Sequence, residues 1–167
     1  GYSVGGLGDT NADARGEFVI GVPNRSAAFG LAGQAEVWSA PSACPAPSSY
    51  CTAANNSSGG PALMGYAGST SISTNGFVLQ TSGTPPNKLA LYAYSANQAN
   101  TPSGNGFLCI GAPLVRLPAT TTSGAGTATY LLNFNTLPAA GPINAGDVRN
   151  FVLWFRDPPA GGANYNF

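Results

Sequence analysis

Turn-forming residues interrupt this chain so often that no long helix can form. The 167 residues include 23 glycines and 14 prolines. Glycine adopts backbone angles that other residues avoid, and proline cannot continue a helix. Only short apolar runs lie between turn clusters such as Gly83–Asn87, Pro102–Gly106 and Ser123–Gly126. Runs of this length without helical periodicity predict strands, and 10% aromatic residues argue against disorder. The sequence therefore predicts an all-β fold.

The short runs also suggest how the chain is organised. We expect residues 1–40 to form a small β segment and residues 41–61, rich in Pro, Ser and Asn, to form a linker. Residues 62–167 are predicted to form an antiparallel β-sandwich of immunoglobulin-like or jelly-roll-like type. The expected strands are Tyr2–Leu7, Glu17–Val22, Gln34–Ser39, Ala62–Ala67, Gly76–Ser82, Lys88–Ser95, Gly106–Ile110, Leu114–Leu117, Thr127–Asn135 and Arg149–Asp157.

Side-chain alternation predicts which strands are buried. Within Lys88–Ser95 one alternating set is Ala90, Tyr92 and Tyr94, which is typical of a strand with one well-buried face. Phe151–Phe155 is apolar at every position. This second pattern indicates a central strand.

An acidic loop, residues 9–17, holds three of the six carboxylates of the chain. Oxygen-bearing side chains recur at alternate positions, a spacing that lets a tight loop surround a hard cation. The expected calcium ligands are Asp9, Asn11, Asp13, the backbone carbonyl of Arg15, and Glu17. The alternative is a metal-free polar turn between two strands.

Charge is scarce elsewhere in the chain. Lys88 is the only charged residue between Val37 and Val115, and the formal net charge is zero. No basic surface is expected for nucleic acid, and no apolar run is long enough to be inserted in a membrane. A surface of Ser, Thr, Asn and Gly suits an extracellular, glycosylated or assembled protein. Asn24, Asn55 and Asn56 match the N-glycosylation acceptor pattern.

The three cysteines, Cys44, Cys51 and Cys109, allow three single-bridge pairings, each of which leaves one thiol over. Cys44 and Cys51 bracket a short Pro-rich loop and could close it locally. The chain has no CxxC motif and no histidine, which argues against a zinc site.

The residue inventory favours a non-enzymatic protein. Without histidine, His-based triads are excluded, and only Glu36, Asp147 and Asp157 are acidic outside the loop. The expected roles of Asp147 and Asp157 are turn capping or a local ion pair. Exposed tyrosines and tryptophans could instead stack on glycans, although aromatic residues in alternating strands more often belong to a core.

Residues 4–38 resemble one FG-GAP repeat, the calcium-binding blade unit of integrin-type β-propellers. The resemblance rests on the run from Val4 to Pro23 followed by Gly33–Trp38. It implies that the acidic loop binds calcium, with Ala12 and Ala14 standing where the family usually has glycine and Glu17 where it usually has aspartate. A single repeat cannot close a propeller, because each blade needs neighbours to bury its faces.

Residues 51–167 resemble a C-terminal β-domain of large secreted proteins from planctomycete-like bacteria. In that family the chain continues beyond the position of Phe167 into a last strand. The resemblance therefore implies a secreted protein whose sandwich lacks one strand here. The pieces that carry it are Gly68–Ile72, Gly83–Asn87, Gly104–Gly111, Val115–Pro118, Ile143–Gly146 and Trp154–Pro158.

A sandwich without its terminal strand exposes unpaired backbone groups beside an apolar slot. Strand complementation between copies would fill this slot and build a head-to-tail fibre. We therefore expect an extracellular fibre subunit that binds its own copies and structural calcium. The alternatives are a fragment of a longer protein, or a calcium-dependent adhesion or glycan-binding module of a larger secreted bacterial protein.

Overall fold

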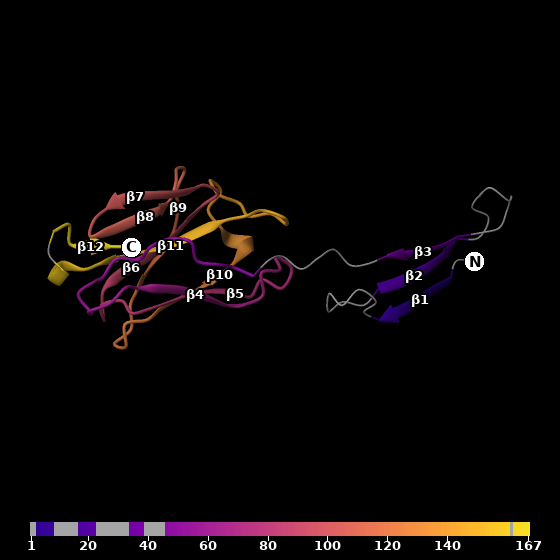
Figure 1. Cartoon of the computed structure of the whole chain (residues 1–167), viewed down its shortest axis with the longest axis horizontal. Coiled ribbons are helices and arrows are strands. Elements are labelled where there is room, and N and C mark those ends of the chain that lie inside the picture. Colours follow the sequence, from indigo (N-terminus) through magenta and orange to yellow (C-terminus); the bar gives the residue numbers. More distant parts are fainter. Residues whose placement is uncertain (1–2, 9–16, 23–33, 39–45, 161) are drawn as a thin grey trace. The chain divides into compact units, whose positions relative to one another are not determined.

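The computed structural model describes residues 3–8, 17–22, 34–38, 46–160 and 162–167. The chain divides into two compact units, Gly1–Pro45 and Ala46–Phe167, which are treated separately below. The regular elements are β-strands and two 3₁₀ turns, and every strand pairing is antiparallel (Figure 1). The prediction of an all-β protein is confirmed.

The first unit is a three-stranded sheet in the order β1-β2-β3. Its strands are β1 (Ser3–Gly8), β2 (Glu17–Val22) and β3 (Gln34–Trp38). All three were predicted to within one residue. All six residues of β1 are exposed to solvent.

The second unit contains two larger sheets and a hairpin. We call them the β5 sheet (order β10-β5-β4), the β6 sheet (order β12-β11-β6-β9) and the β7–β8 hairpin. The strands are β4 (Leu63–Gly68), β5 (Phe77–Ser82), β6 (Leu89–Ser95), β7 (Gln98–Ser103), β8 (Gly106–Ile110), β9 (Val115–Thr121), β10 (Ala128–Leu132), β11 (Asn150–Arg156) and β12 (Tyr165–Asn166), and the 3₁₀ turns are η1 (Phe134–Thr136) and η2 (Pro158–Ala160).

The β5 and β6 sheets share the main hydrophobic core. Alternate residues of β6 enter it, and Tyr92 is fully buried between the two sheets. The buried members of this core are Phe77, Leu79, Ala90, Tyr92, Tyr94, Val115, Leu117, Ala128, Leu132, Leu153 and Phe155. Two antiparallel sheets therefore share one core, and the sandwich, with its immunoglobulin-like or jelly-roll-like type, stays a prediction.

The β7–β8 hairpin covers the other face of the β6 sheet. Ala93 of β6, Ile110 of β8 and Val152 of β11 form a second buried cluster there. Strands β6 and β11 are therefore buried on both faces. This confirms the central position predicted for Phe151–Phe155, and it shows that the single buried face expected for β6 was incomplete.

Two prolines explain the largest errors in predicted strand boundaries. The sequence predicted a turn from Pro102, but β7 runs through this residue, and β9 likewise continues past Pro118. Among the described strands, β7 pairs only with β8, and β9 only with β6. Proline is tolerated in both because each strand has an unpaired side where no N–H donor is needed.

Residues 46–61 belong to the second unit, although they were predicted as linker. Asn55 forms an isolated β-bridge with Pro61. The side-chain amide of Asn56 donates to the Gly83 carbonyl at 2.7 Å. The backbone N–H of Ser57 donates to the Asp157 carboxylate at 3.0 Å. Polar composition suggested a linker, but these hydrogen bonds fix the segment to the sheets.

Candidate functional site

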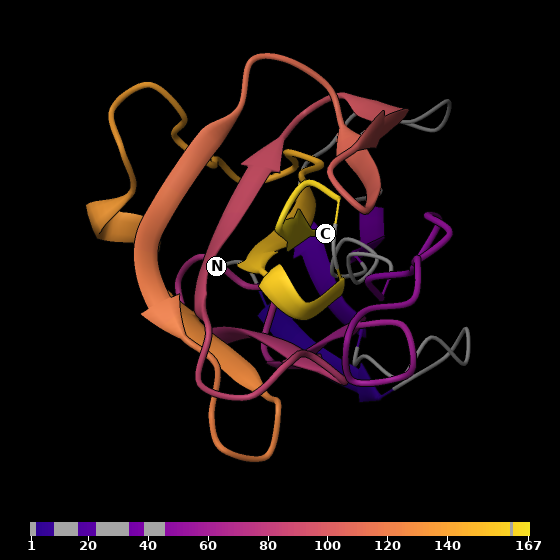
Figure 2. The same ribbon diagram turned by 90° about the vertical axis from the view of Figure 1, so that its left-hand side faces the viewer.

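The C-terminal strand β12 covers only one end of β11. Phe155 pairs with Asn166 and Arg156 with Tyr165. On the side of β11 that faces away from β6, no strand of the described residues pairs with residues 150–154. We call residues 150–154 the open edge of β11. Figure 2 shows the yellow C-terminal segment near the middle of the second unit, seen end-on.

The open edge of β11 lacks the features that usually protect an edge strand. Charges, prolines and irregular register discourage pairing with another chain. The edge strand β9 has Arg116, Pro118 and a register shift opposite β6 between Leu91 and Ala93. Residues 150–154 contain no charge and no proline, and their pairing with β6 is regular. No sequence feature of this edge therefore opposes an added strand, although Asn150, Val152 and Leu153 are themselves buried.

Partly exposed aromatic rings lie near the open edge. Phe151 is half-buried, and its ring centroid lies 5.6 Å from that of Tyr94 and 6.3 Å from that of Phe77. Tyr66 of β4, which is 40% exposed, stacks on Phe77 at 5.8 Å. Because β10 contacts β9 on the opposite side, β4 and β11 lie on the same side of the unit. A strand added at β11 would meet apolar side chains there.

Strand β12 is held by close packing, and it was not predicted from the sequence. The rings of Trp154 and Tyr165 lie 6.0 Å apart, and those of Tyr165 and Phe167 lie 5.9 Å apart. The backbone of Asn105, in the β7–β8 turn, donates to the Tyr165 carbonyl at 2.9 Å. A side chain at Gly104 would collide with the Tyr165 ring. The alternating aromatic residues Tyr165 and Phe167 were the signal that could have revealed this strand.

The acidic loop connects β1 to β2. Gly8 at the end of β1 pairs with Glu17 at the start of β2, so the two ends of the loop are held together. Gly8 has a φ of 71°, which glycine adopts without strain. The Glu17 side chain is only 4% exposed. The other expected ligands, Asp9, Asn11, Asp13 and Arg15, lie outside the described residues.

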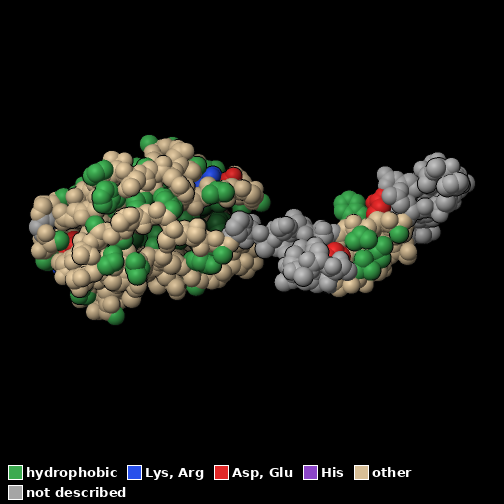
Figure 3. Space-filling view, viewed as in Figure 1, with side chains coloured by type: hydrophobic (Ala, Val, Ile, Leu, Met, Phe, Trp, Pro, Cys, Tyr) green, Lys and Arg blue, Asp and Glu red, His purple; other side chains and the backbone are tan. Residues whose placement is uncertain are grey.

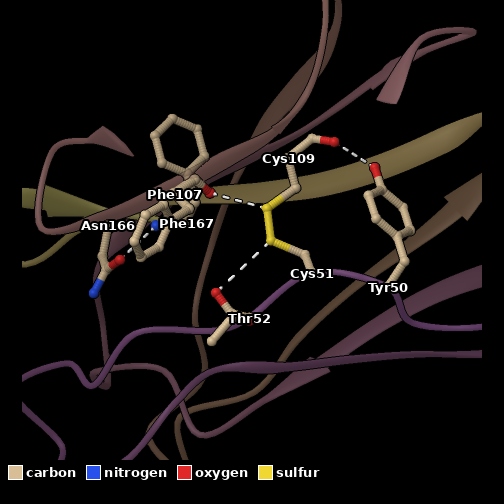
Figure 4. The surroundings of a disulfide bond; sticks show 7 residues. All are labelled: Tyr50, Cys51, Thr52, Phe107, Cys109, Asn166 and Phe167. Atoms are coloured by element: carbon tan, nitrogen blue, oxygen red, sulfur yellow. Dashed lines mark hydrogen bonds between the residues drawn. A yellow bond between two sulfur atoms is a disulfide. The ribbon is translucent and has the colours of Figure 1, made fainter. Parts of the chain in front are cut away.

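A disulfide joins Cys51 to Cys109, whose Cα atoms lie 6.0 Å apart (Figure 4). This pairing excludes the local Cys44–Cys51 bridge that the spacing allowed, and Cys44 itself lies outside the described residues. The hydroxyl of Tyr50 donates to the carbonyl of Cys109, so adjacent residues attach the same segment to β8. A disulfide is consistent with an oxidising, extracellular environment.

The two described glycosylation candidates differ in accessibility. Asn56 is buried, and its amide nitrogen is used in the hydrogen bond to Gly83. Asn55 is exposed, and its backbone carbonyl accepts a hydrogen bond from Asn166. A glycan on Asn56 would require local unfolding, whereas one on Asn55 would not. Asn24 lies outside the described residues.

The isolated acids have structural surroundings. Asp147 accepts a hydrogen bond from the backbone of Asn144 and forms an ion pair with Arg149 at 2.8 Å. Asp157 is fully buried and holds the Ser57 backbone. The contacts of Asp147 are the turn-capping and ion-pair roles expected from the sequence, whereas Asp157 accepts a hydrogen bond from a residue 100 positions away, which was not expected.

Within the described residues, no helix is long and apolar enough to cross a membrane. Comparison of the chain with protein-family models, curated proteins and solved structures finds no match.

Proposed function

We propose that this protein is a non-enzymatic, extracellular structural subunit that assembles into a fibre by adding a strand of one copy to the sheet of the next. The observation that carries this proposal is the open edge of β11. Its backbone lies in a strand whose two faces are already covered, so adding a strand needs no rearrangement of the core. The Cys51–Cys109 bond supports the extracellular setting.

The physical gain from strand addition has two sources. Unpaired N–H and C=O groups of the open edge would acquire partners, and the half-buried aromatic surface near Phe151 and Tyr66 would lose contact with water. Self-association also meets little electrostatic opposition, because the formal net charge is zero. Few charged side chains appear on the face of the molecule drawn in Figure 3.

Closing the open edge within one chain tests this proposal. In the observed register, residues added after Phe167 would continue along β11, and the first would fall opposite Leu153. We expect an extension of Val-Thr-Val-Thr to pair with the edge, keep the protein monomeric and raise its melting temperature. Light scattering and thermal unfolding of the full chain measure both effects.

An extension of Val-Pro-Val-Pro is the matched control, because proline provides no N–H for the ladder. This variant should polymerise like the unmodified chain. Polymerisation of the Val-Thr-Val-Thr variant at the concentration required by the unmodified chain would reject the β11 edge as the acceptor.

Calcium in the acidic loop is a further part of the proposed function. Asp9, Asn11, Asp13, Glu17 and the Arg15 carbonyl would hold the ion, and the buried Glu17 at the loop base is consistent with a nearby positive charge. At a concentration one hundred times its dissociation constant, calcium should stabilise the first unit by about 3 kcal/mol. Thermal unfolding with calcium and with a chelator measures this difference.

The double variant Asp9→Ala/Asp13→Ala should abolish the calcium effect. Glu36→Ala is the control, since it removes a carboxylate from the same unit but outside the loop. Equal melting temperatures of the unmodified chain with and without calcium would contradict the metal site.

One observation favours the second candidate function, a glycan-binding or adhesion module. A shallow depression across β4, β5 and β10 has no charged residue in its lining, which combines the apolar residues Leu63, Met64 and Ala128 with Gly65 and with the polar residues Gln80, Thr81, Ser82, Thr127 and Thr129. Amide and hydroxyl groups of this kind hydrogen-bond to neutral sugars. A protein that stays monomeric at every concentration and binds a neutral glycan would favour this function.

A further inference from the structure

We propose that the strand added to the open edge of β11 is β1 of a second copy of this chain. This inference rests on the proposed function and names the donor. It makes each chain an acceptor through β11 and a donor through β1. Repetition of a head-to-tail contact of this kind extends into a fibre when its rotation does not close a ring.

Strand β1 has the properties of an unprotected donor. It lies at one edge of its sheet, and all six of its residues, Ser3–Gly8, are exposed. The strand contains no charge and no proline, and Gly5 and Gly6 present no side chain to obstruct a neighbour. Its register with β2 shifts between Gly6 and Gly8, so the regular part of this edge is Ser3–Gly6. Val4 is 69% exposed and would be covered by pairing. The green patches on the first unit in Figure 3 show that its apolar side chains reach the surface.

The opposite edge of the same sheet is less suited to donation. Strand β3 carries the charged residue Glu36 at its centre, and the bulky Trp38 at its end is 51% exposed. A charge on an edge strand disfavours pairing, because the added strand would restrict its hydration. Substitutions on β1 and on β3 can therefore be compared to test which edge of the first unit donates the strand.

Length and charge also fit the pairing of β1 with β11. In the register of β12, Phe167 falls opposite Trp154, which leaves Asn150–Leu153 of the open edge for an added strand. The four regular residues Ser3–Gly6 of β1 are enough to span these positions, and neither segment contains a charged residue. Strand β12 already fixes the direction of the added strand, which must run antiparallel to β11 to continue its register. A second copy is the chosen partner because the chain itself supplies a complementary, uncharged edge.

A lysine on β1 tests this inference, because lysine on an edge strand is a natural barrier to pairing. Val4→Lys should raise the concentration at which polymer appears by about tenfold or more. Val37→Lys is the matched control: Val37 is 63% exposed in β3, so this change adds the same charge to the same sheet. It should leave polymerisation unchanged. Sedimentation of the full chain over a concentration series measures both.

Hydrogen exchange tests the same inference on the unmodified chain, so no substituted variant has to fold. In polymer of the unmodified chain, the amides of Ser3–Gly8 and Asn150–Leu153 should be protected relative to dispersed protein. Two results would overturn the assignment of β1 as the donor: Val4→Lys polymerises as readily as the unmodified chain, or the β1 amides stay unprotected in the polymer. Either result would leave the proposed fibre function standing. Protection of both segments in a monomer would show pairing within one chain and would also overturn this assignment. An unmodified chain that never polymerises would instead reject the proposed function.

Discussion

The double variant Cys51→Ser/Cys109→Ser, which lacks the Cys51–Cys109 disulfide, should have a free energy of unfolding of the second unit about 4 kcal/mol lower than that of the unmodified chain. The bond joins positions 58 residues apart, so it restricts a long loop of the unfolded chain. The bond also holds the segment that begins at Tyr50 against β8, where the Tyr50 hydroxyl donates a hydrogen bond to the Cys109 carbonyl. Urea denaturation of the variant and the unmodified chain measures the difference.

Cys44→Ser is the matched control for the disulfide variant, because it removes a cysteine and keeps the Cys51–Cys109 bond. Its unfolding should match that of the unmodified chain, and peptide mapping should find Cys51 linked to Cys109. A bond from Cys44 to either residue in the native protein, or an unchanged stability of the double variant, would contradict this account.

Loss of the buried Tyr92 hydroxyl should have the second-largest effect on the free energy of unfolding. The Tyr92 hydroxyl lies 3.0 Å from the Thr81 hydroxyl and 3.0 Å from the Ala128 carbonyl, and so connects the β6 sheet to the β5 sheet. Tyr92→Phe leaves both groups buried without this partner and should cost about 1–3 kcal/mol. Tyr130→Phe is the control, since Tyr130 packs against Tyr92 at 6.2 Å and its hydroxyl forms no hydrogen bond with another described residue.

The same tyrosine gives a dependence on pH that can be measured separately. Burial raises the pKa of Tyr92, and the hydrogen bond to Thr81 offsets part of this shift. The unfolded tyrosine ionises near pH 10, before the folded one does. Its contribution to stability is therefore complete below about pH 10 and is lost as the pH rises through the higher pKa of the folded state. Between about pH 8 and about pH 11, the free energy of unfolding should fall less in Tyr92→Phe than in the unmodified chain. Equal slopes would contradict the assignment.

Local sequence patterns were sufficient to predict most strands. Turn residues separate short apolar runs, and the run Phe151–Phe155 identified the central strand β11 because all its side chains are apolar. These features act over a few residues, so they can be recognised without knowledge of the tertiary fold.

Features that depend on distant contacts could not be predicted in the same way. Asn56 and Ser57 resemble linker residues in sequence, and only Gly83 and Asp157, far along the chain, explain why they are ordered. The pairing of Cys51 with Cys109 likewise needs the fold, because the spacing of three cysteines allows every pairing.

One part of the candidate site could be predicted from the sequence, and another part could not. The expectation that a terminal strand is absent came from a resemblance and did not say which strand it would pair with. The structure shows a two-residue strand, β12, that covers only part of β11. Whether an edge is open depends on the order of strands in the sheet, which the sequence alone does not specify. The calcium ligands are visible as a pattern because they lie close together in the sequence.

Cryo-electron microscopy of the unmodified chain at high concentration, in calcium-containing buffer, tests the central claim most directly. The account predicts regular filaments in which the β6 sheet continues into the neighbouring subunit through a strand paired with Asn150–Leu153. Dispersed particles at every concentration, or filaments in which this edge of β11 has no partner, would contradict it.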